Sequence, residues 1–557
     1  MLSPSPRGSL DVLATVLSAT VHGLDGTRVA VEIDLQRGLR AFHIVGLPSL
    51  AVRESRERVV SALQNCGFTL PEKRLTVNLA PADVPKEGAA FDLPIALGVL
   101  AASRQCSPEA LDGICVLGEL ALDGSVRPIR GALPIAIAMR RLGVRRLLVP
   151  RDNLPEVRFV PDLEVLGCAT LQQAAEYVGA RLHSGAAEAG SDGDRSTARP
   201  QPARGITSAL PESGVDPRMA TQCAAPAGPD GTTRAASESL DFSQVFGQEL
   251  VKRALAVAAT GGHHVLMVGP PGVGKSMLAR CLPGLLPPLS QAEALEVRQV
   301  LSVCGQHREA ANPTVCRPFR APHHTLSVPG LVGGGRPVVP GEITLAHHGV
   351  LFMDELPEFP RGLLDLLRQP LEEGVIRLAR ANLQIDYPAR FQLVAAMNPC
   401  ACGFLGHPRK PCRCTPGEVD RYRSRISGPI LDRIDLRIEV QTPSVEQVGC
   451  VGDVVATVRL RERIAAARAR QVDRYARVEG VHSNAQASAP GCRALIRPRR
   501  EAESLLRRAM SRWNLSVRAY ERTLAVARSI ADLDAASDID AHHVAEALQY
   551  RLQQGRD

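Results

Sequence analysis

The stretch "GPPGVGKS", residues 269–276, constrains the fold of this chain more than any other part of the sequence. An apolar run, residues 263–268, leads into it, and a helical pattern follows it. This is the GxxxxGK(S/T) phosphate-binding loop in the strand–loop–helix context that it requires. The glycines let backbone N–H groups close around phosphates, and the helix that follows adds the positive end of its dipole. The sequence therefore predicts a nucleotide site in an α/β domain.

Within this loop, Lys275 is expected to reach the β- and γ-phosphates and Ser276 to ligate Mg²⁺. A second apolar run, residues 349–353, ends in Asp354 and Glu355. At the carboxyl end of a central strand, Asp354 would hold Mg²⁺ and Glu355 would polarise the attacking water. The predicted nucleotide- and magnesium-binding residues are Gly269, Pro270, Pro271, Gly272, Val273, Gly274, Lys275, Ser276 and Asp354.

Three more polar residues follow in an order that suggests catalysis. Asn398 ends another apolar run, residues 391–397, where it could position water near the γ-phosphate. Arg433, in "SGPILDRIDLRIEV", could act in trans on the nucleotide of a neighbouring subunit, as an arginine finger does. Arg518 stands at the start of a helical segment. Taken singly, each arginine could equally be a solvated surface residue.

The chain is predicted to hold three folded parts and one linker. Strand-like and helical runs are mixed in residues 1–183, and apolar runs alternate with helical segments in residues 241–441. Residues 442–557 show helical patterns alone, which predicts an all-α lid domain. Residues 184–240 contain no Phe, Tyr or Trp. Such a segment buries too little apolar surface to offset its ordering entropy, so a disordered linker is predicted there.

The order of these motifs resembles that of AAA+ ATPases. Finer stretches resemble the magnesium-chelatase-like branch of that family: "RPFRAPHHTLS", "LVGGG", "PGEITLAHHGVLFMDELPEF", "LRQPLEEG" and "RYRSRISGPILDRID". The resemblance extends over nearly the whole chain except the linker. It implies an ATPase that uses ATP and Mg²⁺, has a P-loop module with a helical lid, and works as a self-assembled ring of six subunits. It also implies catalytic roles for Glu355, Asn398, Arg433 and Arg518.

The N-terminal part resembles the C-terminal domain of Lon proteases, an α+β fold. The likeness is carried by "VPKEGAAFDLPIALGVLAAS" and by "GELALDGSVRPIRGALPIAIAMRRLGVRRLLVP". Where active Lon proteases have a serine and a lysine, this chain has Ala90 and Leu133. Because neither nucleophile nor base remains, the domain is expected to share the fold without cutting peptides.

Four cysteines crowd into the polar stretch directly after Asn398. They follow a C-x-C, nine residues, C-x-C spacing, and four thiolates can close a tetrahedral zinc site. We therefore predict structural Zn²⁺ on Cys400, Cys402, Cys412 and Cys414. Two alternatives stay open: His407 could replace one ligand, or the four cysteines could be free thiols.

The segment "GVIRLARANLQIDYPARFQL" is predicted to form a hairpin with Arg377 and Arg380 near its tip. Cationic side chains there would suit the phosphates of single-stranded or branched DNA. Two solvated arginines on a hairpin are the alternative interpretation. The net charge of +8 is weak support for an anionic partner. Only five of the 66 basic residues are lysine, a bias that is typical of genome composition rather than of a binding surface.

The finer motifs resemble a group of magnesium-chelatase-like proteins from bacterial competence. This implies a DNA helicase that promotes branch migration in homologous recombination during natural transformation. A chelatase-type ATPase that remodels a protein partner is one alternative, and a nucleotide-gated scaffold is another, although intact Asp354 and Glu355 argue against the scaffold. The sequence shows neither a signal peptide nor a membrane-spanning apolar run. A cytoplasmic protein without a membrane partner is therefore expected.

Overall fold

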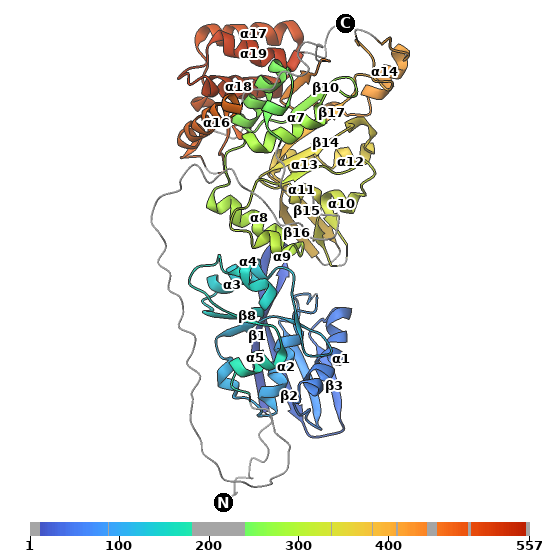
Figure 1. The fold of residues 1–557 in the computed structure, drawn as a ribbon, viewed down its shortest axis with the longest axis vertical. Coiled ribbons are helices and arrows are strands. Elements are labelled where there is room, and N and C mark those ends of the chain that lie inside the picture. Colours follow the sequence, from blue (N-terminus) through green and yellow to red (C-terminus); the bar gives the residue numbers. More distant parts are fainter. Residues whose placement is uncertain are drawn as a thin grey trace, which may run out of the picture.

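A computed structural model describes most of the chain. Figure 1 shows an N-terminal part, coloured blue to cyan, beside a larger part coloured green to red. The predicted linker, residues 184–240, lies outside the described residues except for Leu240. The described residues are 12–86, 88–180, 240–335, 337–380, 383–407, 410–442, 454–478, 480–487 and 492–552. In these ranges, no helix has the length and apolar character needed to cross a bilayer.

A seven-stranded mixed sheet, in the order β3-β4-β2-β1-β5-β8-β9, forms the N-terminal part. The long strands β1 (Val12–His22) and β2 (Asp25–Gln36) pair antiparallel along their whole length. Buried and half-buried residues alternate along β2, as expected for a strand with one face on the core. The other strands are β3 (Ala41–Val45), β4 (Arg74–Ala80), β5 (Ile114–Val116), β8 (Arg146–Pro150) and β9 (Glu164–Cys168), with a separate pair β6 (Glu119–Leu120) and β7 (Val126–Arg127).

Helix α2 (Asp92–Ala102) is buried along its whole length and packs on β1 and β2. Its first residue, Asp92, is held by the Arg58 guanidinium at 2.6 Å, while burial raises the pKa of this carboxyl group. An ion pair at the helix start thus joins α2 to the neighbouring helix. The helices of this part are α1 (Leu50–Asn65), α2, α3 (Ala132–Arg141), α4 (Leu154–Val157) and α5 (Leu171–Tyr177).

The larger part is built on a parallel five-stranded sheet, in the order β11-β14-β17-β10-β18. Its strands are fully buried at the centre; all six residues of β17, for example, are buried. Such strands are apolar on both faces, which is typical of parallel sheets covered by helices on each side. The strands are β10 (Val265–Val268), β11 (Phe319–Arg320), β14 (Val350–Met353), β17 (Gln392–Met397) and β18 (Leu436–Glu439). This confirms the mixed α/β prediction with a parallel sheet.

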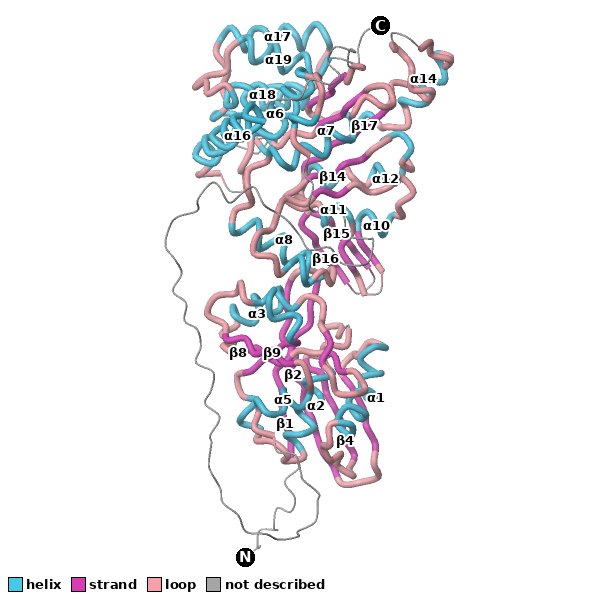
Figure 2. The backbone as a smooth tube through the Cα atoms, viewed as in Figure 1, coloured by secondary structure: helices cyan, strands magenta, loops and turns pink. Residues whose placement is uncertain are grey.

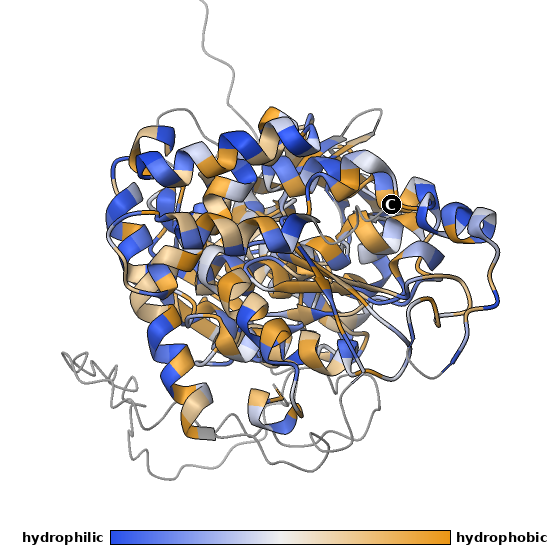
Figure 3. Ribbon diagram, turned by 90° about the horizontal axis from the view of Figure 1, so that it is seen from above, coloured by the Kyte–Doolittle hydropathy of each residue, from blue (hydrophilic) through white to orange (hydrophobic). Residues whose placement is uncertain are grey.

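Alternate residues of these strands enter two different cores. Val265 and Met267 pack with helices α6 (Glu249–Gly261) and α7 (Lys275–Cys281). Leu266, between them, packs with residues of α12 (Arg361–Asp365) and α13 (Arg368–Glu373). Figure 3 shows apolar strands in the interior and polar residues on the outer turns of the helices around them. The remaining helices of this part are α8 (Gln291–Val303), α9 (His307–Ala310), α10 (Val328–Val332), α11 (Glu342–Leu345), α12 (Arg361–Asp365), α13 (Arg368–Glu373), α14 (Pro416–Arg423) and α15 (Gly428–Leu431).

A hairpin lies between the third and fourth sequence strands of this sheet, as predicted. Strand β15 (Val375–Arg380) pairs antiparallel with β16 (Leu383–Pro388). The tube drawing in Figure 2 shows the hairpin close to the N-terminal part. A Cβ atom at Gly23, in the turn between β1 and β2, would lie 2.9 Å from Ile385 Cγ2. The turn of the N-terminal sheet thus rests directly on the hairpin.

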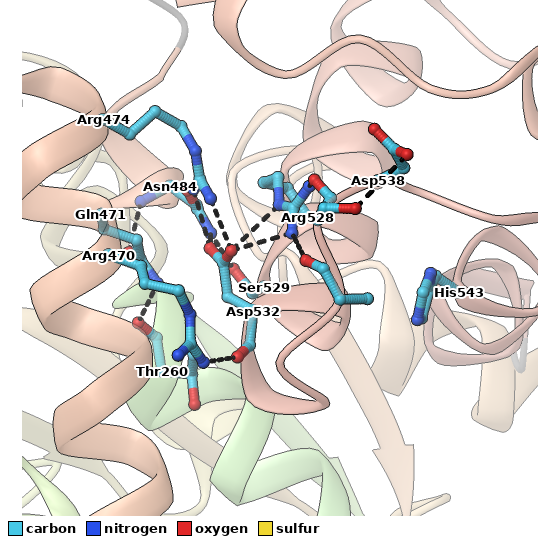
Figure 4. Close-up of polar contacts among 12 residues, drawn as sticks. Thr260, Arg470, Gln471, Arg474, Asn484, Arg528, Ser529, Asp532, Asp538 and His543 are labelled. Atoms are coloured by element: carbon cyan, nitrogen blue, oxygen red, sulfur yellow. Dashed lines mark hydrogen bonds and ion pairs between the residues drawn. The ribbon is translucent and has the colours of Figure 1, made fainter.

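The described residues after 453 contain helices and no strands. They are α16 (Val454–Tyr475), α17 (Arg500–Trp513), α18 (Val517–Leu533) and α19 (Ala541–Leu552). The fully buried carboxylate of Asp532 on α18 organises them (Figure 4). Arg474 donates to both of its oxygens, at 2.6 and 2.8 Å, and Asn484 donates at 2.9 Å. A buried charge is tolerated only when it is paired and hydrogen-bonded, so these contacts tie α16, α18 and the segment around Asn484 together.

The N-terminal part touches the larger part through α3 and α8. The backbone N–H of Gly131 donates to the carbonyl of Ser302 at 3.0 Å, and that of Leu133 donates to the Ser302 hydroxyl at 3.3 Å. The Arg298 guanidinium stacks over the Phe159 ring at 4.1 Å from its centroid. Hydrogen bonds and a cation–π contact therefore join α8 to the N-terminal part.

Candidate functional site

The residues predicted to bind nucleotide meet at the carboxyl ends of three neighbouring parallel strands. Residues 269–276 follow β10, Asp354 and Glu355 follow β14, and Asn398 follows β17. Ligands of open α/β sheets bind at this edge. Gly272 and Gly274 have φ angles of 81° and 89°, a backbone region that side chains with a Cβ atom rarely adopt. The loop can turn there only because both positions are glycine.

Lys275 is buried inside the loop that it belongs to. Its Nζ donates to the carbonyls of Gly269 at 2.7 Å and Pro270 at 2.8 Å, and to Asn398 Oδ1 at 3.1 Å. Burial lowers the pKa of Lys275, and the carboxylates of Asp354 and Glu355 oppose that shift. The ammonium group is thus held between the loop and Asn398, where it can exchange carbonyl partners for phosphate oxygens.

The Ser276 hydroxyl donates to Asp354 Oδ2 at 2.6 Å. A hydroxyl beside a carboxylate supplies two oxygens of the kind that Mg²⁺ prefers, leaving its other positions to water and phosphates. The donor set of Ser276 and Asp354 therefore fits Mg²⁺ bound together with a nucleotide.

Glu355 adopts a left-handed backbone, with φ 49°, and its N–H donates to Asp354 Oδ1 at 3.0 Å. Its carboxylate is exposed, and His324 Nδ1 lies 3.9 Å from its Oε2. His324 was not predicted from the sequence. The two histidines of "APHHT" were the available signal, but nothing in the sequence placed them beside β14.

Arg433 and Arg518 lie together, away from this loop. Arg433 precedes β18, which runs parallel to β10 with Leu436 opposite Val265. It therefore lies at the amino ends of the strands, and a four-residue strand spans about 13 Å. Arg433 Nη2 lies 2.9 Å from Glu372 Oε2, and Arg518 Nη2 lies 2.7 Å from Glu372 Oε1. The two predicted catalytic arginines thus share one carboxylate at the edge opposite the P-loop.

A second cluster of possible ligands lies just before β14. Glu296 Oε2 is 2.8 Å from His347 Nε2 and 2.7 Å from His348 Nε2. His347 Nδ1 also accepts the N–H of Arg390 at 3.0 Å, so Nε2 must carry the proton that it shares with Glu296. Burial lowers the pKa of His347 to about 4. This histidine is a neutral donor with no lone pair left for a metal, and its contacts tie α8 to β14.

The four clustered cysteines come together in the structure. The Sγ atoms of Cys400 and Cys402 are 3.4 Å apart, and each lies 3.6 Å from Cys412 Sγ. Cys414 completes a group whose ligand atoms all lie within 4.8 Å of one another. Zinc–sulfur bonds of 2.3 Å in a tetrahedron place sulfur atoms about 3.8 Å apart. The donor set therefore fits a tetrahedral Zn²⁺ closely.

Hydrogen bonds to sulfur support this fit. The N–H of Cys402 donates to Cys414 Sγ, and the N–H of Cys414 donates to Cys412 Sγ, both at 3.4 Å. The hydrogen bond from the Cys414 N–H lowers the pKa of Cys412, but desolvation and the contacts with Cys402 and Cys400 outweigh it and raise that pKa to about 12. Four thiols at this distance cannot all ionise unless a cation neutralises them. His407 lies outside the four-cysteine group, and its Nδ1 accepts the Lys410 N–H at 3.0 Å.

The cysteine loop lies against the P-loop. A Cβ atom at Gly403 would lie 2.9 Å from Pro271 Cδ and 3.9 Å from Asn398 Cγ. Gly403 has a φ angle of 82°, so the close approach and the backbone both require glycine. The conformation of the cysteine loop therefore bears directly on the loop that would hold phosphates.

Arg377 lies in the middle of the hairpin, not near its tip as predicted. It stands opposite Asp386 in the strand register, and its Nη1 is 2.7 Å from Glu373 Oε2. Arg380 is the last residue of β15 and so borders the turn; its side chain lies outside the described part. The strand register, which a hairpin sequence alone does not specify, accounts for the difference.

Ala90 and Leu133, the two positions that the sequence resemblance matches to the serine and lysine of active Lon proteases, share one apolar cluster. Leu133 is fully buried, Ala90 packs on the same cluster, and Leu295 of α8 packs there as well. The structure thus brings the two positions into one apolar cluster, to which Leu295 of the larger part also contributes.

Three protein-family models match successive parts of this chain. "Subunit ChlI of Mg-chelatase" matches residues 31–153. "Magnesium chelatase, subunit ChlI" matches residues 241–448, and "Magnesium chelatase, subunit ChlI C-terminal" matches residues 455–551. The matches cover both folded parts and the P-loop site.

Several relatives are similar over nearly the full length. Competence protein ComM of Haemophilus influenzae is 40% identical over 542 residues, which cover 97% of each chain. The uncharacterized protein YifB of Escherichia coli is 40% identical over 543 residues, again 97% of each chain. The magnesium-chelatase 67 kDa subunit of Heliobacterium mobile is 30% identical over 230 residues, or 36% of this chain and 33% of that subunit. The first two share the whole architecture, whereas the chelatase subunit shares a segment.

Proposed function

This chain belongs to the family of competence protein ComM and YifB, whose magnesium-chelatase-type domains it shares, and on that premise we propose that it is an ATP-hydrolysing ring motor that moves DNA. The observation that carries this proposal is the convergence of Lys275, Ser276, Asp354 and Asn398 at one edge of the parallel sheet, joined by hydrogen bonds of 2.6 to 3.1 Å. Full-length similarity to a protein named for competence supports a role in competence. Within that role, we propose homologous recombination of incoming DNA as the step that this motor drives. A cytoplasmic location goes with this role.

In this proposal each residue of the P-loop site has one task. Lys275 binds the β- and γ-phosphates, while Ser276 and Asp354 hold Mg²⁺, which neutralises phosphate charge when bound. Glu355 takes a proton from the attacking water, and Asn398 positions that water. Backbone N–H groups of residues 269–276 bind the remaining phosphate oxygens. Arg433 and Arg518 act on the nucleotide of the next subunit in a ring, which we propose to be a hexamer.

The remaining parts have supporting roles. The N-terminal part, residues 1–183, is proposed to be a Lon-like domain that does not cut peptides, because Ala90 and Leu133 offer neither nucleophile nor base. Residues 442–557 are proposed to form the lid domain of the ATPase. Zn²⁺ on the four clustered cysteines is proposed to stabilise the loop beside Pro271 and Asn398.

DNA contact is assigned to the hairpin that carries Arg377 and Arg380. The hairpin leads through Pro388 into β17, the strand that ends at Asn398, so a shift at the nucleotide can reach it directly. Binding of this kind reads phosphates rather than bases. It should therefore be independent of sequence and should weaken steeply with salt, because each neutralised phosphate releases counterions.

The test is a branch-migration assay on a synthetic four-way junction. Wild-type protein should separate the junction into duplex products by branch migration with ATP, and should not do so with a non-hydrolysable analogue. Arg377→Ala with Arg380→Ala should abolish both junction movement and stimulation of ATP hydrolysis by DNA, because the cationic grip is lost. Gel electrophoresis of labelled junctions measures the first, and phosphate release with and without DNA measures the second.

A matched control is Arg499→Ala with Arg507→Ala, which removes the same charge from exposed, ion-paired positions in or beside α17. This variant should move junctions at the wild-type rate. If wild-type protein neither binds nor moves branched DNA, the DNA role is wrong, and a chelatase-type ATPase that remodels a protein partner takes its place. If both double variants fail equally, net charge rather than the hairpin is responsible.

A further inference from the structure

Glu372, near the end of α13, contacts both predicted catalytic arginines at once. Its Oε2 lies 2.9 Å from Arg433 Nη2, and its Oε1 lies 2.7 Å from Arg518 Nη2. Among the described residues, no other carboxylate forms an ion pair with either arginine. One side chain therefore links the arginine that precedes β18 to the arginine that begins α18.

The charges at this contact allow Glu372 to orient the two arginines without preventing them from binding phosphate. Two guanidinium groups beside each other repel, and a carboxylate between them offsets that repulsion. Two positive charges and one negative charge still leave the group with a net charge of +1, so it attracts phosphate. Each guanidinium has five N–H donors, and the side chain of Arg518 is 51% exposed. Most of its donors remain available while Glu372 is bound.

Arg433 depends on Glu372 more strongly. Its side chain is 9% exposed, and its Nη1 donates to the carbonyl of Pro429 at 2.6 Å. Its buried Nε has no hydrogen-bond partner in the described part of the chain. A buried guanidinium without a carboxylate partner is unfavourable, so removing Glu372 should make this side chain turn away from its present place.

We infer that Glu372 is a positioning residue for ATP hydrolysis: it holds Arg433 and Arg518 side by side for the phosphates of the nucleotide bound to the neighbouring subunit. This inference rests on the proposed function, because it takes the two arginines to act in trans. Their place at the edge opposite the P-loop agrees with that, since their own nucleotide would lie a full strand length away.

The test begins with Glu372→Gln in the full-length chain. Misplacing a catalytic group by about 1 Å can cost on the order of 10²-fold in rate, so we expect a fall in kcat of that size. The affinity of the isolated subunit for a fluorescent ATP analogue should not change, because the P-loop is at the other edge. Glu372→Asp, which keeps the carboxylate, should recover part of the rate.

Subunit mixing separates positioning from a general loss of structure. Lys275→Ala subunits have a defective P-loop and intact arginines, whereas Glu372→Gln subunits have the reverse. Mixed rings should therefore regain activity at the interfaces where an intact P-loop meets intact arginines. Arg433→Ala mixed with Lys275→Ala should recover in the same way. The control is Glu373→Gln, which removes the neighbouring carboxylate and its exposed ion pair with Arg377 at 2.7 Å; its ATP hydrolysis is measured without DNA.

Three results overturn the inference. The first is a Glu372→Gln rate equal to that of Glu373→Gln. The second is recovery of the Arg433→Ala mixture without recovery of the Glu372→Gln mixture, which would make the role of Glu372 structural and leave the trans arginines standing. The third is no recovery in either mixture, which would remove the trans arginines themselves and the inference with them. If Glu372→Gln does not fold, as judged by thermal unfolding, Glu372→Asp takes its place in the same mixtures.

Discussion

Replacing Glu355 with glutamine should give a protein that binds ATP but hydrolyses it about 10²- to 10⁴-fold more slowly than the wild type, the range expected when a general base is lost. Glutamine keeps the size of the side chain and cannot accept the proton of the attacking water. The carboxylate of Glu355 is exposed and lies 3.9 Å from His324 Nδ1, so its replacement leaves no buried charge unpaired. Phosphate release measures the rate, and a fluorescent nucleotide measures the affinity.

Lys275→Ala is the companion variant and should fail at an earlier step. It removes the ammonium group that contacts Gly269, Pro270 and Asn398, so nucleotide affinity itself should fall. Glu358→Gln is a matched control, because Glu358 is a nearby exposed carboxylate that pairs with Arg425 rather than facing the P-loop. Hydrolysis by Glu355→Gln at the rate of Glu358→Gln would remove Glu355 as the base.

Much of the fold could be predicted from local patterns. Apolar runs bounded by polar residues marked β10, β14, β17 and β18, and the structure has all four in one parallel sheet. The hairpin before β17 was also predicted. Strand β1 (Val12–His22) was not, because small and polar residues interrupt its valines and leucines and leave no regular apolar alternation. Its stability comes from pairing with β2 over the whole length, a contact that no local pattern contains.

The candidate site likewise contains residues that local sequence patterns predict and residues that they do not. The P-loop follows β10 and Asp354 follows β14, and these two strands lie on either side of β17 in one parallel sheet, so the sheet brings both to the same edge. Glu372 and His324 could not be predicted, because each acts through a residue far away in the chain. The contact between Glu372 and Arg518 joins α13 to the start of α18, and only the packing of the helices on the sheet brings these elements together. Long-range contacts of this kind leave no signal in residue spacing.

Removing zinc from the four clustered cysteines is expected to destabilise the loop that carries them. Purified protein should carry about one zinc per chain, since four thiolates close one tetrahedral site. Cys412→Ser with Cys414→Ser should abolish zinc binding, because two remaining thiolates are too few to hold the ion. Structural zinc contributes about 10–16 kcal/mol in small zinc domains, far more than a loop of this length gains from packing. Metal analysis of the purified variants measures the loss.

Loss of zinc should also reach the ATPase, because the loop is built against the P-loop. A Cβ atom at Gly403 would lie 2.9 Å from Pro271, and Cys400 follows Asn398 by two residues. A loosened cysteine loop therefore removes one wall of the site that positions Lys275 and Asn398, and ATP hydrolysis should fall with the metal. Cys304→Ser with Cys316→Ser removes two thiols outside the cluster and should keep both zinc and activity. Wild-type protein that is fully active without metal would reduce the cluster to four free thiols and leave the loop conformation to Gly403 and its neighbours.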